Sequence, residues 1–116
     1  MTETASVTVE QVGDVSVVRL SAKRFDAQSF EVLTRKLYHM IDREGCRKIV
    51  LNLQDVEYLF SESVGLLLGL EKRIKRSGCE LRLCGLRPTV RQTLEVSQLQ
   101  DLFEIHEDEA AALKEF

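Results

Sequence analysis

Two serines and a glutamate stand where a long apolar helical pattern begins. Ser61, Glu62 and Ser63 follow the short stretch 58–60 and precede a run that starts at Val64. The first N–H groups of a helix have no partner inside it, so a serine at this point can cap them. A phosphoserine there carries a charge of about −1.5 to −2 near the positive end of the helix dipole. The position of Ser63 is therefore typical both of a cap and of a phosphorylation site, and we expect the fold to accept the phosphate without unfolding.

Asp55 follows a dense apolar run, as the phosphoacceptor aspartate of a receiver domain does. A receiver also needs an acidic pair after its first strand, and the segment 20–23 (Leu-Ser-Ala-Lys) has none. The sequence also contains no glycine-rich phosphate loop, no G-x-S-x-G elbow and no cysteine–histidine pairing. An enzyme is therefore disfavoured. Labelling of Asp55 by acetyl phosphate would identify a receiver, and a failure to label would remove that alternative.

The cysteines and histidines form no metal or redox motif. Cys79 and Cys84 are separated by four residues, whereas redox and zinc motifs use two. His39 and His106 lie far from Cys46 and from each other, without ligand spacing. We expect reduced, structural thiols, no metal and no cofactor.

Length and charge limit the classes of protein that this chain can be. Its 116 residues fit one domain, 1–116. A net charge of −3 and no basic face disfavour direct binding of nucleic acid through general electrostatics. No apolar run approaches the ~20 residues of a membrane span, and the segment 1–10 does not resemble a signal peptide. These features predict a cytoplasmic protein that is not inserted in a membrane.

The first half of the chain predicts a hairpin followed by a helix. Two β-rich runs, 7–9 and 15–20, flank the turn signal Gly13-Asp14, which favours an antiparallel pair. Apolar residues then recur every three or four positions over 27–44. Asp26 is the expected N-cap of this helix, and Gly45 the expected stop.

The second half alternates strands with helices. Strands are expected at 48–53, 80–85 and 103–106, and helices at 61–76, 90–96 and 107–116. The order ββαβαβαβα demands parallel strands joined by right-handed crossovers. The fold class is α/β, a mixed sheet with helices mainly on one face. Gly65 and Gly69 fall on one side of the second helix, where we expect a close approach of a neighbouring element.

Four segments, in order and at matching spacings, resemble one known family. Residues 49–56 (IVLNLQDV) resemble its central strand and the following turn, and 58–70 (YLFSESVGLLLGL) its signature around an acid–serine pair. Residues 78–86 resemble its next strand, and 90–99 its third helix. This is the STAS domain family, which includes bacterial anti-sigma factor antagonists and the cytosolic tails of sulfate transporters.

The resemblance implies roles for particular residues. Ser63 matches the serine that a partner kinase phosphorylates, and Glu62 stands where the family usually has aspartate. Val64 occupies a position that is commonly serine or another small residue. Asp26 matches an acid near the serine, and Asp55 the acid in the turn after the central strand. These five residues are the expected partner-binding set.

The family implies two functions. In the first, the chain is an anti-sigma factor antagonist: it binds an anti-sigma factor that is also a serine kinase, and releases it when Ser63 is phosphorylated. The partner supplies ATP and magnesium, so the chain itself is no enzyme. In the alternative, the chain is a non-phosphorylated adaptor in a transporter-associated or scaffold complex, and Ser63 only caps its helix.

Overall fold

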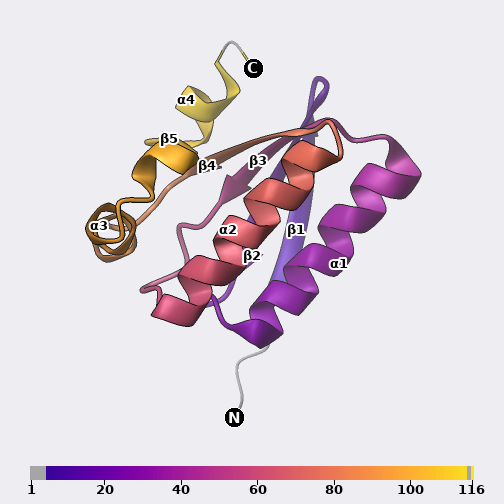
Figure 1. Ribbon diagram of the computed structural model, residues 1–116. Coiled ribbons are helices and arrows are strands. Elements are labelled where there is room, and N and C mark those ends of the chain that lie inside the picture. The colour runs from indigo at the N-terminus through magenta and orange to yellow at the C-terminus, as the bar shows by residue number, and fades with distance from the viewer. Residues whose placement is uncertain (1–4, 115) are drawn as a thin grey trace.

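A five-stranded sheet with the spatial order β1-β2-β3-β4-β5 lies at the centre of the computed structural model, which describes residues 5–114 and 116 (Figure 1). The first two strands pair antiparallel, and every later neighbour pairs parallel. This arrangement confirms the predicted mixed sheet. The strands are β1 (Ser6–Val12), β2 (Val15–Ser21), β3 (Lys48–Asn52), β4 (Glu80–Cys84) and β5 (Glu104–His106).

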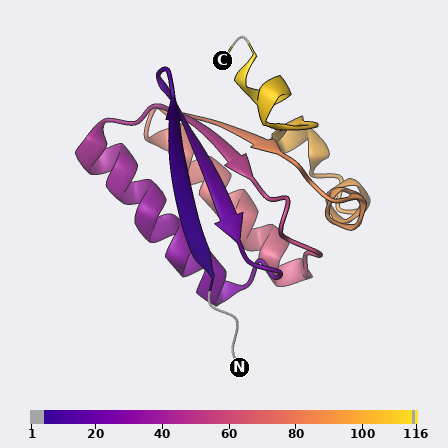
Figure 2. The same cartoon turned by 180° about the vertical axis from the view of Figure 1, so that it is seen from behind.

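The helices lie unequally on the two faces of the sheet (Figures 1 and 2). They are α1 (Ala27–Glu44), α2 (Ser61–Arg76), α3 (Pro88–Val96) and α4 (Glu109–Leu113), with a 3-10 turn at Gln100–Leu102. Buried residues of α1, α2 and α3 belong to one large core, whereas α4 contributes Ala112 to a smaller core. The prediction of helices mainly on one face is therefore confirmed, with α4 as the exception.

Strand residues alternate between these two cores. Ile49 and Leu51 of β3 face the large core, and Val50 between them faces the small one. All three are fully buried. A strand covered on both faces needs a continuous apolar run, which is the pattern that marked this segment in the sequence.

The ends of α1 are set by the residues that the sequence indicated. The Asp26 carboxylate accepts the Ser29 N–H at 2.9 Å, and the Ser29 hydroxyl accepts the Asp26 N–H at 2.9 Å. Gly45 ends the helix with a φ of 70°, a left-handed conformation that favours glycine. Both predicted boundaries are confirmed.

One packing prediction is wrong. Gly65 and Gly69 lie on the exposed side of α2, and a Cβ added to either would meet nothing within 4 Å. The core side of α2 carries Leu67, Leu70 and Ile74, all fully buried. The glycines therefore expose backbone to solvent and do not receive a neighbouring element.

The last elements differ in extent from the prediction. The final helix spans only five residues, and the 3-10 turn before β5 was not expected. Within the described residues, no helix is both long enough and apolar enough to cross a membrane.

Candidate functional site

The candidate residues gather at one end of the molecule. Parallel strands place their carboxyl ends at the same edge of the sheet, so the loops that follow β2, β3 and β4 meet there. Figure 1 shows that α1 and α2 both begin at this end. The predicted Asp26 and Ser63 stand at those two helix starts, and Asp55 lies in the loop between β3 and α2.

The loop that leads to Ser63, residues 53–60, is tied to both of its neighbours. Two contacts join it to the segment after β2, and two join it to the segment after β4. They are Glu57 N–H to Lys23 O at 2.9 Å, Arg24 Nε to Tyr58 Oη at 3.0 Å, Arg87 Nε to Gln54 O at 2.8 Å, and a hydrogen bond from the Thr89 hydroxyl to Glu57 O. These contacts hold the entry to α2 in one conformation.

Ser63 is a buried cap. Helix α2 begins at Ser61 as predicted, and the Phe60 N–H donates to Ser63 Oγ at 3.3 Å. Ser63 is only 1% exposed. Little of the Ser63 side chain is therefore open to solvent in the observed conformation. The expectation that the fold accepts a phosphate on Ser63 without unfolding stays a prediction.

The surface around this cap combines an aromatic side chain with polar groups. Phe60 is 50% exposed, and its ring packs edge-on against Tyr58 with centroids 5.0 Å apart. Ser61 and Glu62 are exposed beside it. Val64, by contrast, is buried in the large core and presents little surface to a partner.

The two predicted aspartates occupy different environments. The Asp26 carboxylate accepts hydrogen bonds at the start of α1, chiefly from the Ser29 N–H, and these lower its pKa. Asp55 is exposed and lines a cavity on another side of its loop. Among the described residues, no hydrogen bond or ion pair joins either aspartate to Ser63.

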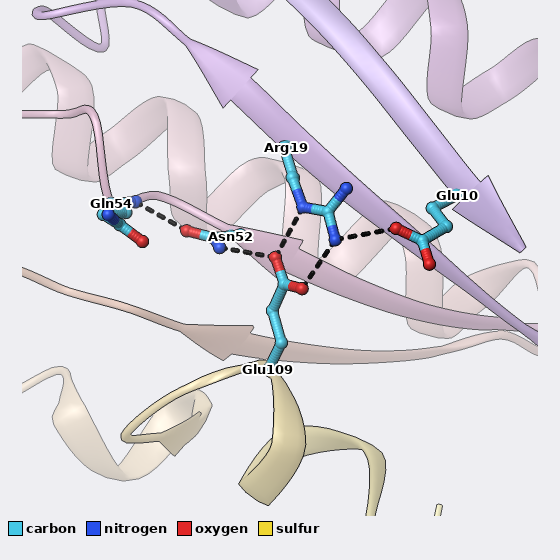
Figure 3. A network of polar contacts seen from close by, with 5 residues as sticks. All are labelled: Glu10, Arg19, Asn52, Gln54 and Glu109. Carbon is cyan, nitrogen blue, oxygen red and sulfur yellow. Dashed lines mark hydrogen bonds and ion pairs between the residues drawn. The ribbon is translucent and has the colours of Figure 1, made fainter. Parts of the chain in front are cut away.

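That cavity, of about 840 Å³, lies between the ends of β2, β3 and β4 and the start of α4. Figure 3 shows the polar network on its wall. Arg19 donates through Nε and Nη2 to both carboxylate oxygens of Glu109, each at 2.7 Å. Asn52 donates to Glu109 Oε2 at 2.6 Å and accepts the Gln54 N–H at 2.8 Å.

These polar groups satisfy one another, so the network is best described as a clamp that holds α4 to the sheet. The hydrogen bonds from Arg19, followed by that from Asn52, lower the pKa of Glu109. Sequence analysis missed the clamp. Arg19 and Asn52 were visible as polar residues at strand ends, but nothing local linked them to a glutamate far along the chain.

No group of three or more histidine, cysteine or acidic side chains within the described part of the chain is arranged to hold a metal ion. Cys46, Cys79 and Cys84 are free thiols. Burial, with the nearby charge of Glu109, raises the pKa of the Cys84 thiol to about 12, which keeps it protonated and unreactive.

Comparison with known proteins identifies the family. The STAS domain profile matches residues 6–112. The chain is 30% identical over 109 residues to the anti-sigma F factor antagonist of Paenibacillus polymyxa, an alignment that covers 94% of this chain and 92% of that protein.

Solved structures agree on the fold. An anti-sigma factor antagonist from Mycobacterium paratuberculosis matches with a TM-score of 0.77 at 20% identity, covering 95% of this chain and 92% of that one. The Bacillus protein SpoIIAA matches in its unphosphorylated form with a TM-score of 0.69 at 24% identity, covering 91% and 92% of the two chains. Its phosphorylated form gives 0.65 at 23% identity, covering 91% and 96%. The STAS profile matches almost the whole chain, and the P. polymyxa relative aligns with it over nearly the full length of both proteins. The solved structures share its fold. We conclude that this chain belongs to the STAS domain family.

Proposed function

We propose that this protein is an anti-sigma factor antagonist that works by partner switching. The observation that carries the proposal is the match, over nearly the full length of both chains, to the anti-sigma F factor antagonist of P. polymyxa. In this proposal the chain binds an anti-sigma factor, which thereby releases its sigma factor. The chain itself catalyses nothing.

The contact is assigned to the exposed start of α2, named here the α2-start surface: Phe60, Ser61, Glu62 and Gly65. A half-exposed phenyl ring supplies an apolar anchor of the kind that dominates interface energetics. Gly65 leaves the backbone bare one turn further on. Asp26 at the start of α1 and Asp55 in the preceding loop are proposed to contact the partner at the margins, whereas buried Val64 supports the helix from beneath.

Phosphorylation of Ser63 is the proposed switch. A serine kinase activity of the partner, with ATP and magnesium, would transfer the phosphoryl group. Because Ser63 is buried, its modification requires the first turn of α2 to open, which breaks the hydrogen bond from the Phe60 N–H. The phosphate then places a dianion next to Glu62 in the contact surface, and a penalty of roughly 3 kcal/mol weakens binding more than a hundredfold. SpoIIAA, a structural neighbour, has been solved both with and without phosphate.

Titration calorimetry with the anti-sigma factor encoded in the same genome tests the proposal. Ser63→Ala should bind as the wild type does and resist inactivation by the kinase with ATP. Ser63→Asp should bind at least tenfold more weakly. Phe60→Ala should also weaken binding at least tenfold, because it removes the apolar anchor. Circular dichroism of each variant separates loss of binding from loss of folding.

If folded Ser63→Asp and Phe60→Ala both bind with the wild-type affinity, the proposed surface is wrong. If no anti-sigma factor binds the wild type, the function itself is wrong.

The burial of Ser63 also supports a second candidate function, that of an adaptor whose serine is purely a cap. Mass spectrometry of the protein from its own cells distinguishes the two. A persistent absence of phosphate from Ser63, across growth and stress conditions, would favour the adaptor.

A further inference from the structure

Strand β1, the darkest indigo ribbon in Figure 2, forms one margin of the five-stranded sheet. Within residues 5–114 and 116, no strand pairs with its outer edge. All seven residues of β1 pair with β2 in one continuous register, without a bulge, and six of the seven are exposed. We infer that two copies of this chain associate through their β1 edges, as an antiparallel pair that joins the two sheets. The inference is independent of the proposed function.

The turn after β1 determines which of its backbone groups point outward. Only two residues connect β1 to β2, so the pair next to the turn, Val12 and Val15, must exchange both of its hydrogen bonds. Hydrogen-bonded and non-hydrogen-bonded pairs alternate along an antiparallel ladder. The N–H and C=O groups of Val7, Val9 and Gln11 therefore point away from β2. They are free to pair with a further strand, which is how an exposed edge binds another chain.

β1 lacks the features that usually protect an exposed edge. Such edges are commonly very short or bulged, or they carry lysine or proline. β5, at the opposite margin, is only three residues long, whereas β1 has seven residues and contains neither lysine nor proline. The one charged side chain of β1, Glu10, forms an ion pair with Arg19 of β2 at 3.0 Å. The edge is thus long, regular and weakly charged, as a strand-pairing interface requires.

The sequence of β1 favours a second copy of itself as the occupant. With the two-fold axis at Val9, all seven residues pair, and the two copies of this 36% exposed valine cover each other. Thr8 then lies opposite Glu10 on both sides of the axis, so neither glutamate faces its counterpart. An axis at Glu10 would place the two glutamates opposite each other, which is unfavourable. An axis at Thr8 would leave Gln11 and Val12 without a partner in the other strand.

Sedimentation equilibrium of the full chain over a range of concentrations tests the association. A contact of one strand from each chain is small, so we expect the mass to rise from that of one chain to twice that value only as the concentration rises. Val9→Lys should raise the dissociation constant about tenfold, because it places two ammonium groups opposite each other at the axis. Val96→Lys is the matched control, since Val96 is 77% exposed on α3, and it should leave the dissociation constant unchanged.

Two results of this experiment would overturn the inference. One is a wild type that stays monomeric up to about 1 mM, including the case in which the edge binds an extended segment of another protein instead. The other is a dimer that Val9→Lys leaves unchanged, which would mean that a different surface forms it.

Opposite charges introduced at Thr8 test the register. Thr8→Lys places an ammonium group opposite Glu10 of the other copy on both sides of the axis, and should lower the dissociation constant about threefold. Thr8→Glu places like charges there and should raise it by a similar factor. Within one chain Thr8 lies opposite Arg19, so the glutamate favours the folded monomer, and loss of the dimer in this variant does not result from unfolding. Equal dissociation constants for the two variants would overturn the register and the proposed edge with it.

Discussion

At the level of single residues, the Glu109 carboxylate is held by hydrogen bonds from two different strands. It accepts two hydrogen bonds from Arg19 and one from Asn52, and its pKa is lowered chiefly by the Arg19 bonds. A carboxylate with a lowered pKa in the folded state stabilises the fold above its unfolded pKa. That contribution is lost as the pH falls through the folded pKa.

Glu109→Gln should therefore destabilise the protein at neutral pH and have little effect in acid. We expect the free energy of unfolding at pH 7 to fall by about 1 kcal/mol, a modest value because Arg19 is 42% exposed and the pair is screened. Below about pH 4 the difference from the wild type should shrink, since the wild-type carboxyl protonates as well.

Urea unfolding measured from pH 7 to pH 3 checks this prediction. Glu95→Gln is the matched control, because Glu95 is exposed and has no ion pair within the described residues. A difference between wild type and Glu109→Gln that is constant with pH would contradict the assigned role of the carboxylate.

The serines at the start of α2 allow a second residue-level prediction. Ser63→Ala removes the acceptor for the Phe60 N–H and should lower the free energy of unfolding by about 1 kcal/mol. Ser61→Ala should change it by less than about 0.5 kcal/mol, because that hydroxyl is exposed. Equal effects of the two substitutions, measured by urea unfolding, would show that Ser63 is not the cap.

At the level of elements, two glycines differ in the space around them: Gly85 is crowded and Gly65 is not. Gly85 follows β4 with a φ of 69°, and a Cβ there would lie 2.9 Å from Asn52 Oδ1. That Asn52 oxygen accepts the Gln54 N–H and so sets the turn after β3. Gly65, about one turn after the start of α2, has open space around it.

Alanine should therefore have opposite effects at the two positions. Gly85→Ala should lower the free energy of unfolding by about 2 kcal/mol, because it combines a left-handed backbone with a steric clash. Gly65→Ala should raise it by about 0.5–1 kcal/mol, through the higher helix propensity of alanine. Thermal and urea unfolding provide the measurement, and a stabilised Gly85→Ala would contradict the observed turn.

At the level of the whole molecule, α4 closes the second face of the sheet. Ala112 packs with Val15, Val17, Val50 and Cys84, and all five are buried. Arg82 donates to the backbone oxygens of this segment, and its guanidinium lies 4.1 Å from the centroid of the Phe116 ring. The small core therefore depends on a segment distant in sequence from the strands that it covers.

Ala112→Asp should detach α4 without unfolding the rest of the domain. Burial of a charge in an apolar site is costly unless the charge is paired, and the large core on the other face remains complete. We expect the Cys84 thiol to become accessible, and its pKa to fall from about 12 toward the ordinary value of about 8.5.

Alkylation with iodoacetamide at pH 7.5, followed by mass spectrometry, checks the outcome. Cys84 should react at least tenfold faster in Ala112→Asp than in the wild type. Cys79, buried in the large core, is the internal control and should stay protected. Equal exposure of both cysteines would indicate global unfolding and contradict an independent second face.

Most of the fold was readable from local patterns. The helix at 27–44 was predicted from apolar residues that recur every three or four positions, with Asp26 as its cap and Gly45 as its stop. These signals all depend on residues close in sequence, and each was predicted where the structure has it. The parallel sheet followed from the alternation of strands and helices. The spatial order β1-β2-β3-β4-β5 was not predicted, and only the strand pairings establish it.

The site was only partly readable. The sequence by itself determined that Ser61, Glu62 and Ser63 begin a helix, because capping and periodicity are local properties. Only the tertiary structure decided that Ser63 is buried and Ser61 exposed, because the sheet and its neighbouring helices determine which side of α2 faces the core. The same reason explains the exposed Gly65 and the Arg19–Glu109 clamp: which residues share a face, or meet across 90 positions of chain, depends on packing that no local pattern contains.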